Sequence, residues 1–138
     1  VLKPGGIAAM IQTDWGDPFI VPESKALSRF LELFEAGFNR NGGSLNRGRY
    51  LRANMQEAGF EIEEFAAQLA NYTDSDRVTG VVNGYIAWME NLPLFRESIE
   101  LGLTTEAELV TLKAEMQAWS AGPDAYFANA RTYAIARK

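Results

Sequence analysis

The sequence contains no cysteine and no histidine among its 138 residues. Without cysteine, the chain has no disulfide framework, no thiolate nucleophile and no cysteine metal site. Without histidine, it lacks the commonest general base, the usual zinc ligand and the central residue of the catalytic triads. These two absences exclude the triad hydrolases and the common zinc chemistries.

Clustered positive charge and long apolar runs are also missing. The net charge is −5 and no basic run occurs, so we expect no nucleic-acid partner, which would need clustered Lys and Arg. No apolar run approaches the ~20 residues of a membrane span, and no signal-peptide pattern opens the chain. We therefore expect a cytoplasmic protein with no membrane span. A composition of 47% apolar and 22% charged residues is typical of one globular domain.

The chain opens with a turn signal followed by a short apolar run. Residues 3–6 read Lys-Pro-Gly-Gly, where proline presets φ and glycine accepts the positive φ of a type II turn. Residues 7–11 are apolar without alternation, which is typical of a strand buried on both faces. The run stops at residues 12–14 and Trp15, and ligands bind at the carboxyl ends of strands in open α/β sheets.

No other strand precedes this first strand, and the chain begins with Val rather than Met. We interpret the chain as a fragment of a longer protein. An apolar edge without a neighbour is a template for pairing with another chain, so we expect self-association through the first strand.

Apolar residues at helical spacing predict five helices between the first strand and the last segment. Ser24 is expected to cap the first helix, and Thr105 with Glu108 forms a capping-box pattern before the fifth. The expected helices are the segment after Ser24, residues 46–58, the segment around Val78 to Met89, residues 94–101, and the segment after Thr105.

Two further strands are expected at residues 60–70 and 126–138. In the last of these, neither alternate set of positions is consistently polar. That pattern suits a strand covered on both sides.

Several stretches of the chain resemble a known family. They are VLKPGG at residues 1–6, NRGRYL at 46–51, EAGF at 57–60, AYF at 125–127 and YAIARK at 133–138. In their order and spacing they resemble the C-terminal half of a class I S-adenosylmethionine-dependent methyltransferase, in the branch of ubiquinone/menaquinone-type small-molecule methylases.

The resemblance implies a partial α/β fold for residues 1–138. The chain would be mostly helical with a three-stranded mixed sheet, the C-terminal half of a Rossmann-like methyltransferase fold. The last strand would lie antiparallel between the other two. No Gly-x-Gly-x-x-Gly occurs, so no residue is assigned to cofactor binding. The resemblance implies that only the intact protein binds S-adenosylmethionine and that this fragment alone is inactive.

The resemblance also implies that this half forms one side of the pocket for a small-molecule methyl acceptor. The candidate substrate-binding residues are Asp14, Trp15, Phe19, Arg47, Arg49, Tyr85 and Trp88. Each has a structural alternative. Asp14 can orient or deprotonate an acceptor hydroxyl, or it can be a turn carboxylate. The arginines can bind an anionic acceptor or remain solvated, and the aromatic residues can line the pocket or fill the core.

No catalytic residue and no metal site are assigned. The charges Glu61, Glu63 and Glu64 are expected to face solvent, because a hard-metal site needs convergent oxygens. The alternative function is a non-catalytic helical binding or dimerisation module, consistent with the high helix content and the missing cofactor loop. A nicotinamide-type Rossmann tail fits less well, because those sheets usually lack the antiparallel penultimate strand.

Overall fold

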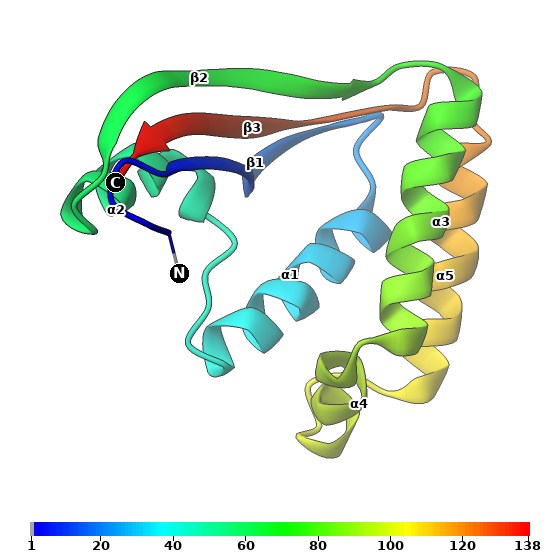
Figure 1. Ribbon diagram of the computed structural model, residues 1–138. Helices are drawn as coiled ribbons and strands as arrows, with labels where there is room; N and C mark the ends of the chain where they lie inside the picture. The colour runs from blue at the N-terminus through cyan, green and yellow to red at the C-terminus, as the bar shows by residue number, and fades with distance from the viewer. Residues whose placement is uncertain (1) are drawn as a thin grey trace. The chain divides into compact units, whose positions relative to one another are not determined.

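The computed structural model describes residues 2–138 as a mixed α/β chain (Figure 1). The elements in chain order are β1 (Ile7–Val21), α1 (Lys25–Arg40), the 3-10 helix η1 (Arg47–Tyr50), α2 (Leu51–Glu57), β2 (Glu61–Tyr72), α3 (Ser75–Asn91), α4 (Pro93–Glu100), α5 (Glu106–Ser120) and β3 (Tyr126–Arg137).

The three strands form one sheet in the order β1-β3-β2, with β3 between the other two (Figure 1). Backbone hydrogen bonds join Gly5 and Gly6, just before β1, to Lys138, just after β3, so these two strands run antiparallel. The expected strand order is therefore confirmed. The expectation of a mixed sheet is wrong, because β1 and β2 both run against β3 and are not neighbours, which leaves an antiparallel sheet.

The chain divides into two compact units, which we describe separately. Unit 1 holds the described residues up to Pro18, Leu45–Asn71 and Ala128–Lys138; unit 2 holds Phe19–Ser44 and Tyr72–Phe127. In unit 1, Leu51 and Met55 of α2 pack against Ala134 and Ala136 of β3. Small side chains on β3 let the short helix lie close to the sheet, which explains why the last strand is rich in alanine.

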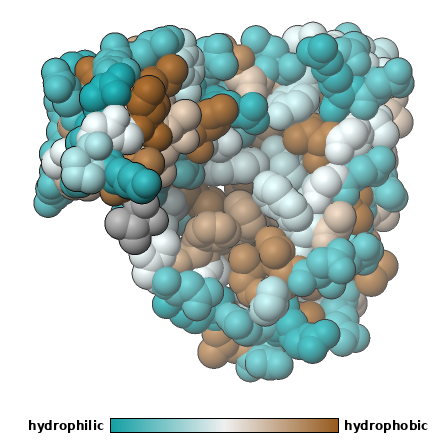
Figure 2. All heavy atoms as spheres, in the orientation of Figure 1, coloured by the Kyte–Doolittle hydropathy of each residue, from teal (hydrophilic) through white to brown (hydrophobic). Residues whose placement is uncertain are grey.

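The burial of the strands differs from the expectation at β1. Ile7, Met10 and Ile11 are exposed, Ile11 at 70%, so the prediction of a strand buried on both faces is wrong for β1. Apolar side chains are visible among hydrophilic ones on the face drawn in Figure 2. β3 is better covered: Phe127, Ala128 and Asn129 are all buried. Beyond them only every second residue is buried and the residues between are partly exposed, so the predicted cover on both faces holds only for the first part of β3.

The first strand is also longer than expected. The sequence placed its end near Gln12, with Asp14, Trp15 and Phe19 in a loop beyond it; all three lie within β1, which continues to Val21. Gly16 and Pro18 suggested a loop, yet both are tolerated in an edge strand, where one side of the backbone needs no partner.

Unit 2 is held together by aromatic stacking among its helices. The ring of Phe30 on α1 lies 5.0 Å from that of Tyr85 on α3 and 5.8 Å from that of Phe95 on α4. The predicted cap of α1 is confirmed, since Ser24 Oγ accepts a hydrogen bond of 3.2 Å from the Leu27 backbone N–H. The helices α1, α3 and α4 therefore share one aromatic core.

The predicted capping box at α5 is only half formed. Thr105 Oγ1 accepts from the Glu108 backbone N–H at 3.1 Å, as expected. The Glu108 carboxylate instead accepts from Arg29 Nε at 2.8 Å and Thr104 Oγ1 at 2.9 Å. An arginine on α1 is a stronger partner than a backbone N–H, so the side chain links α5 to α1.

The remaining elements follow the predicted positions with shifted boundaries. Strands β2 and β3 lie where two strands were expected. The helix predicted over residues 46–58 is divided into η1 and α2, and Asn46 makes no side-chain cap. Among the described residues, every helix is too short or too polar to cross a lipid bilayer.

Gly37 allows α1 and α4 to approach closely, and this contact can be tested. A Cβ placed at Gly37 would lie 2.8 Å from Leu94 Cβ, whereas a Cβ at Gly80 on α3 would meet nothing within 4 Å. We expect Gly37→Ala to lower the free energy of unfolding by about 1–2 kcal/mol, the cost of overpacking less the gain in helix propensity. Gly80→Ala, the matched control, should raise it by up to about 1 kcal/mol. Urea unfolding measures both, and equal effects of the two variants would contradict the close contact.

The free side of β1 generates a second prediction. We expect the chain to form dimers at micromolar concentration, because the other side of β1 has no partner strand among the described residues and its apolar residues 7–11 carry no charge. Ile11→Lys should shift sedimentation velocity profiles to monomer. Val110→Lys, which alters a similarly exposed residue (62%) on α5, should not. A wild-type chain that stays monomeric at high concentration would contradict this expectation.

Candidate functional site

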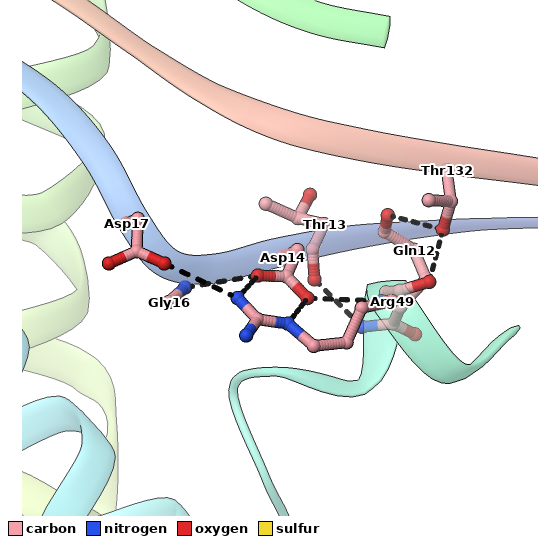
Figure 3. A network of polar contacts seen from close by, with 8 residues as sticks. Gln12, Thr13, Asp14, Gly16, Asp17, Arg49 and Thr132 are labelled. Atoms are coloured by element: carbon pink, nitrogen blue, oxygen red, sulfur yellow. Dashed lines mark hydrogen bonds and ion pairs between the residues drawn. The ribbon is translucent and has the colours of Figure 1, made fainter. Parts of the chain in front are cut away.

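Asp14 is the centre of a polar network in unit 1 (Figure 3). Its side chain lies on β1 with only 5% of the residue exposed. Oδ1 accepts from Arg49 Nη2 at 2.7 Å and from the Gly16 backbone N–H at 3.1 Å. Oδ2 accepts from Arg49 Nε at 2.9 Å and from the Arg49 backbone N–H at 3.0 Å. The carboxylate therefore receives four hydrogen bonds, two of them from one guanidinium in a bidentate arrangement.

Two glycines make this close approach between β1 and η1 possible. A Cβ at Gly48 would lie 2.8 Å from Asp14 Cβ, and a Cβ at Gly16 would lie 2.1 Å from Arg49 Nη2. The carbonyl of Gly48 also accepts a 2.8 Å hydrogen bond from Thr132 Oγ1 on β3. The network thus fixes η1 to the two neighbouring strands. A larger residue at Gly16 would displace the arginine, and one at Gly48 would push η1 away from Asp14.

The electrostatics of the pair favour the charged forms of both groups. The hydrogen bond from the Arg49 side chain lowers the pKa of Asp14 below its usual value near 3.8, and this effect outweighs the desolvation that burial imposes. The same bond raises the pKa of Arg49. Asp17, whose side chain is 93% exposed, adds a weaker contact of 3.7 Å to Arg49 Nη2.

The geometry favours the structural alternative for Asp14. A general base must be free to accept a proton from its substrate, and its pKa should lie near the working pH. Here both carboxylate oxygens are occupied and the pKa of Asp14 is lowered. Arg49 is likewise engaged, so the pair acts as a clamp between β1 and η1.

Trp15 and Arg47 have different surroundings from this pair. Consecutive residues of a strand point to opposite faces, so Trp15 faces away from the side on which Asp14 meets Arg49. The Trp15 backbone N–H donates to the Leu45 carbonyl at 3.1 Å. Arg47 is exposed on η1, and its side chain forms no hydrogen bond or ion pair with another described residue.

The other three candidates belong to unit 2. Tyr85 is buried against Phe30, and the Trp88 ring lies 5.2 Å from the Phe34 ring. Both side chains contribute to the aromatic core, which favours their structural alternative. Phe19 is exposed at its place on β1, with its ring 6.5 Å from that of Tyr126.

The central strand contributes polar residues that the sequence did not single out. Asn129 on β3 is 3% exposed, yet its Oδ1 has no hydrogen-bond partner, and neither does the buried Nε of Arg131. The pairing of Gly6 with Lys138 and the contact of Thr132 Oγ1 with the Gln12 carbonyl have the same register, and continuing it along the strands puts Asn129 opposite Trp15. The sequence did contain a signal for these buried polar groups, namely polar residues within a strand that was expected to be covered on both sides. The alternating small residues of the same segment made this signal hard to recognise.

Comparisons with known proteins do not assign a family to the chain. No protein-family model and no curated protein matches its sequence. The function must therefore be argued from the residues and the fold.

The clamp generates a prediction about pH. Asp14→Asn should lower the free energy of unfolding at pH 6 by about 1–3 kcal/mol, because it removes the charged acceptor of buried hydrogen bonds. A lowered pKa in the folded state means that this stabilisation is present above about pH 4 and is lost as the pH falls through the lowered pKa. The difference between wild type and variant in urea unfolding should therefore shrink below pH 4.

The control for this prediction is Asp17→Asn, which removes a neighbouring but exposed carboxylate. Its effect should stay under about 0.5 kcal/mol at every pH. If the two variants behaved alike, the clamp would not contribute to stability.

Proposed function

We propose that the chain is the C-terminal half of an S-adenosylmethionine-dependent methyltransferase domain. The observation that carries the proposal is the strand order β1-β3-β2 with an antiparallel central strand, which is the arrangement the resemblance implied for this half. A fold alone is an argument by analogy, because one fold hosts many functions. The proposal therefore also draws on where the resembling stretches lie.

Two of those stretches contain turns that lead into strands of the sheet. The turn at residues 3–6 directly precedes β1; its Gly5 has φ +79°, and the Gly6 backbone N–H donates to the Lys3 carbonyl at 2.8 Å. Gly59, also at φ +79°, separates α2 from β2. Glycine is the residue that adopts these angles without strain, so both glycines have a structural reason for being where they are.

A chain without histidine or cysteine is compatible with methyl transfer. Bound S-adenosylmethionine supplies an activated methyl group, and the protein's main task is to orient the acceptor. In this proposal, residues outside the chain bind the cofactor, and unit 1 contributes part of the wall that contacts a small-molecule acceptor.

The face of the sheet that carries Trp15 is the best place for that contact. Trp15 supplies an aromatic surface, while Asn129 Oδ1 and Arg131 Nε are a buried acceptor and a buried donor without partners. Both atoms are fully buried, so a hydroxyl or carbonyl group of an acceptor would satisfy them once the side chains that cover them move aside. Unsatisfied buried polar atoms are otherwise costly. Asp14 and Arg49 would then support this wall through the clamp and would not touch the acceptor.

A second candidate function is a non-catalytic binding module. The full occupation of Asp14 by Arg49 favours it, because this leaves the predicted site of unit 1 without a free carboxylate. The two functions differ in one observable reaction: the methyltransferase transfers the methyl group of S-adenosylmethionine to an acceptor, and the binding module does not.

The test is a binding and turnover experiment on a longer protein that carries this chain as its C-terminal part. We expect calorimetry to give a dissociation constant for S-adenosylmethionine of about 1 μM–1 mM, the usual range for enzyme substrates. The chain alone should bind at least tenfold more weakly.

The role of the acceptor wall is tested by Asn129→Leu in the longer protein. With methyl transfer followed by radiolabel, this variant should lower turnover while leaving the affinity for S-adenosylmethionine unchanged. An exposed change on the other edge strand, Gln68→Leu, should alter neither quantity. A longer protein that does not bind S-adenosylmethionine would refute the proposal and leave the binding module.

A further inference from the structure

Unit 2 contains a groove that the proposed function does not use. It lies where the end of α1 meets the start of α4, and its volume is about 480 Å³. That volume is within the range of small-molecule sites. The residues that determine its chemistry are Phe38, Asn41, Leu92, Pro93, Leu94 and Glu97.

The groove has a fixed apolar wall. Gly37 lets Leu94 approach α1 closely, and the Gly43 backbone N–H donates to the Phe38 carbonyl at 2.8 Å as the chain turns after α1. The Phe38 ring packs edge-on against the Phe34 ring at 4.8 Å, yet 37% of Phe38 remains exposed. A ring supported from behind and open in front is ready for a ligand without further ordering.

The charge of the groove comes from Glu97. It is the one ionisable residue that lines the groove, and its carboxylate forms no hydrogen bond or ion pair with the other described residues. An adjoining hollow of about 400 Å³ shares Glu97 and also contains Glu90 and Arg96. Glu90 is engaged with Lys113 Nζ at 3.0 Å, so Glu97 is the carboxylate left for a ligand.

The geometry points to a binding site for a small organic cation, an amine or ammonium attached to an aromatic or branched aliphatic body. The body contacts Phe38, Leu92 and Leu94, and the cationic head pairs with Glu97. An aromatic ring adds attraction for the cation, because the face of its π system is negative. This site does not depend on methyl transfer, so it can be present whether or not the protein is a methyltransferase.

An anionic ligand is the opposite possibility. The groove adjoins the first turn of α4, where the helix dipole favours negative charge, and Arg96 lies in the neighbouring hollow. A free carboxylate inside the groove repels such a ligand. The charge preference of the site therefore separates the two cases directly.

The experiment is an NMR titration of the ¹⁵N-labelled chain with three probes of similar shape: phenethylamine, 2-phenylethanol and 3-phenylpropionate. We expect phenethylamine to shift the amides of Gly37, Gly43 and Leu94, with a dissociation constant of roughly 1–10 mM for so small a probe. The alcohol should bind at least about fivefold more weakly than the amine, and the carboxylate more weakly still.

The variant Glu97→Gln removes the charge at nearly constant shape. It should reduce the affinity for phenethylamine to that for 2-phenylethanol and leave the affinity for the alcohol unchanged. Glu100→Gln, on the exposed side of the same helix, should change neither, and circular dichroism should show both variants folded. Equal binding of amine and alcohol to the wild type, preferred binding of the carboxylate, or an unaltered Glu97→Gln variant would each overturn the inference.

Discussion

The bidentate contact between Asp14 and Arg49 is the constraint on which unit 1 depends. It joins residues 35 positions apart, and it brings η1 so close to β1 that only glycine fits at position 48. Thr132 extends the contact to the central strand. Because α2 follows η1 directly, the clamp also positions Leu51 and Met55 over Ala134 and Ala136. One buried carboxylate thus helps to fix how α2 lies on the sheet.

The contact between Asp14 and Arg49 lies on one face of the sheet, so the two faces differ in the polar groups that they offer. A carboxylate that is satisfied by four donors stabilises structure and is a poor catalyst, so the face that carries Asp14 is a packing face. The alternation of the strand sends Trp15 to the other face, opposite Asn129. Two adjacent residues that looked like one site in the sequence therefore lie on opposite faces of the sheet.

Local patterns predicted much of this fold. The helical spacing of Leu27, Phe30 and Phe34 gave α1 with its Ser24 cap, and the pattern of the last segment indicated a strand. Its central position was what the resemblance implied. The predictions that failed concerned features that depend on contacts between residues distant in sequence. The end of β1 was predicted too early, because glycine and proline indicate a loop when only the local sequence is considered. Both residues are tolerated in an edge strand. The Glu108 side chain pairs with Arg29, 79 residues away in the sequence, and does not complete the capping box. No local motif predicts a partner at that distance. Of the candidate site, the pairing of Asp14 with Arg49 and the burial of Asn129 required the folded chain for the same reason.

The two edge strands of the sheet differ in charge, and this difference indicates which edge favours pairing with a further strand. The exposed residues Glu61, Glu63 and Glu64 lie along β2, and charge on an edge prevents pairing with another strand. Residues 7–11 of β1 carry no charge and expose apolar side chains. Charged side chains that discourage pairing with another strand are thus present on β2 and absent from residues 7–11 of β1, although both strands belong to one small sheet. Further strand pairing is therefore favoured at β1 and disfavoured at β2. The partner strand would be that of a second copy or, in the proposed methyltransferase, another strand of a larger α/β sheet. The proposed methyltransferase topology requires the latter, since it places the remaining strands on this same side.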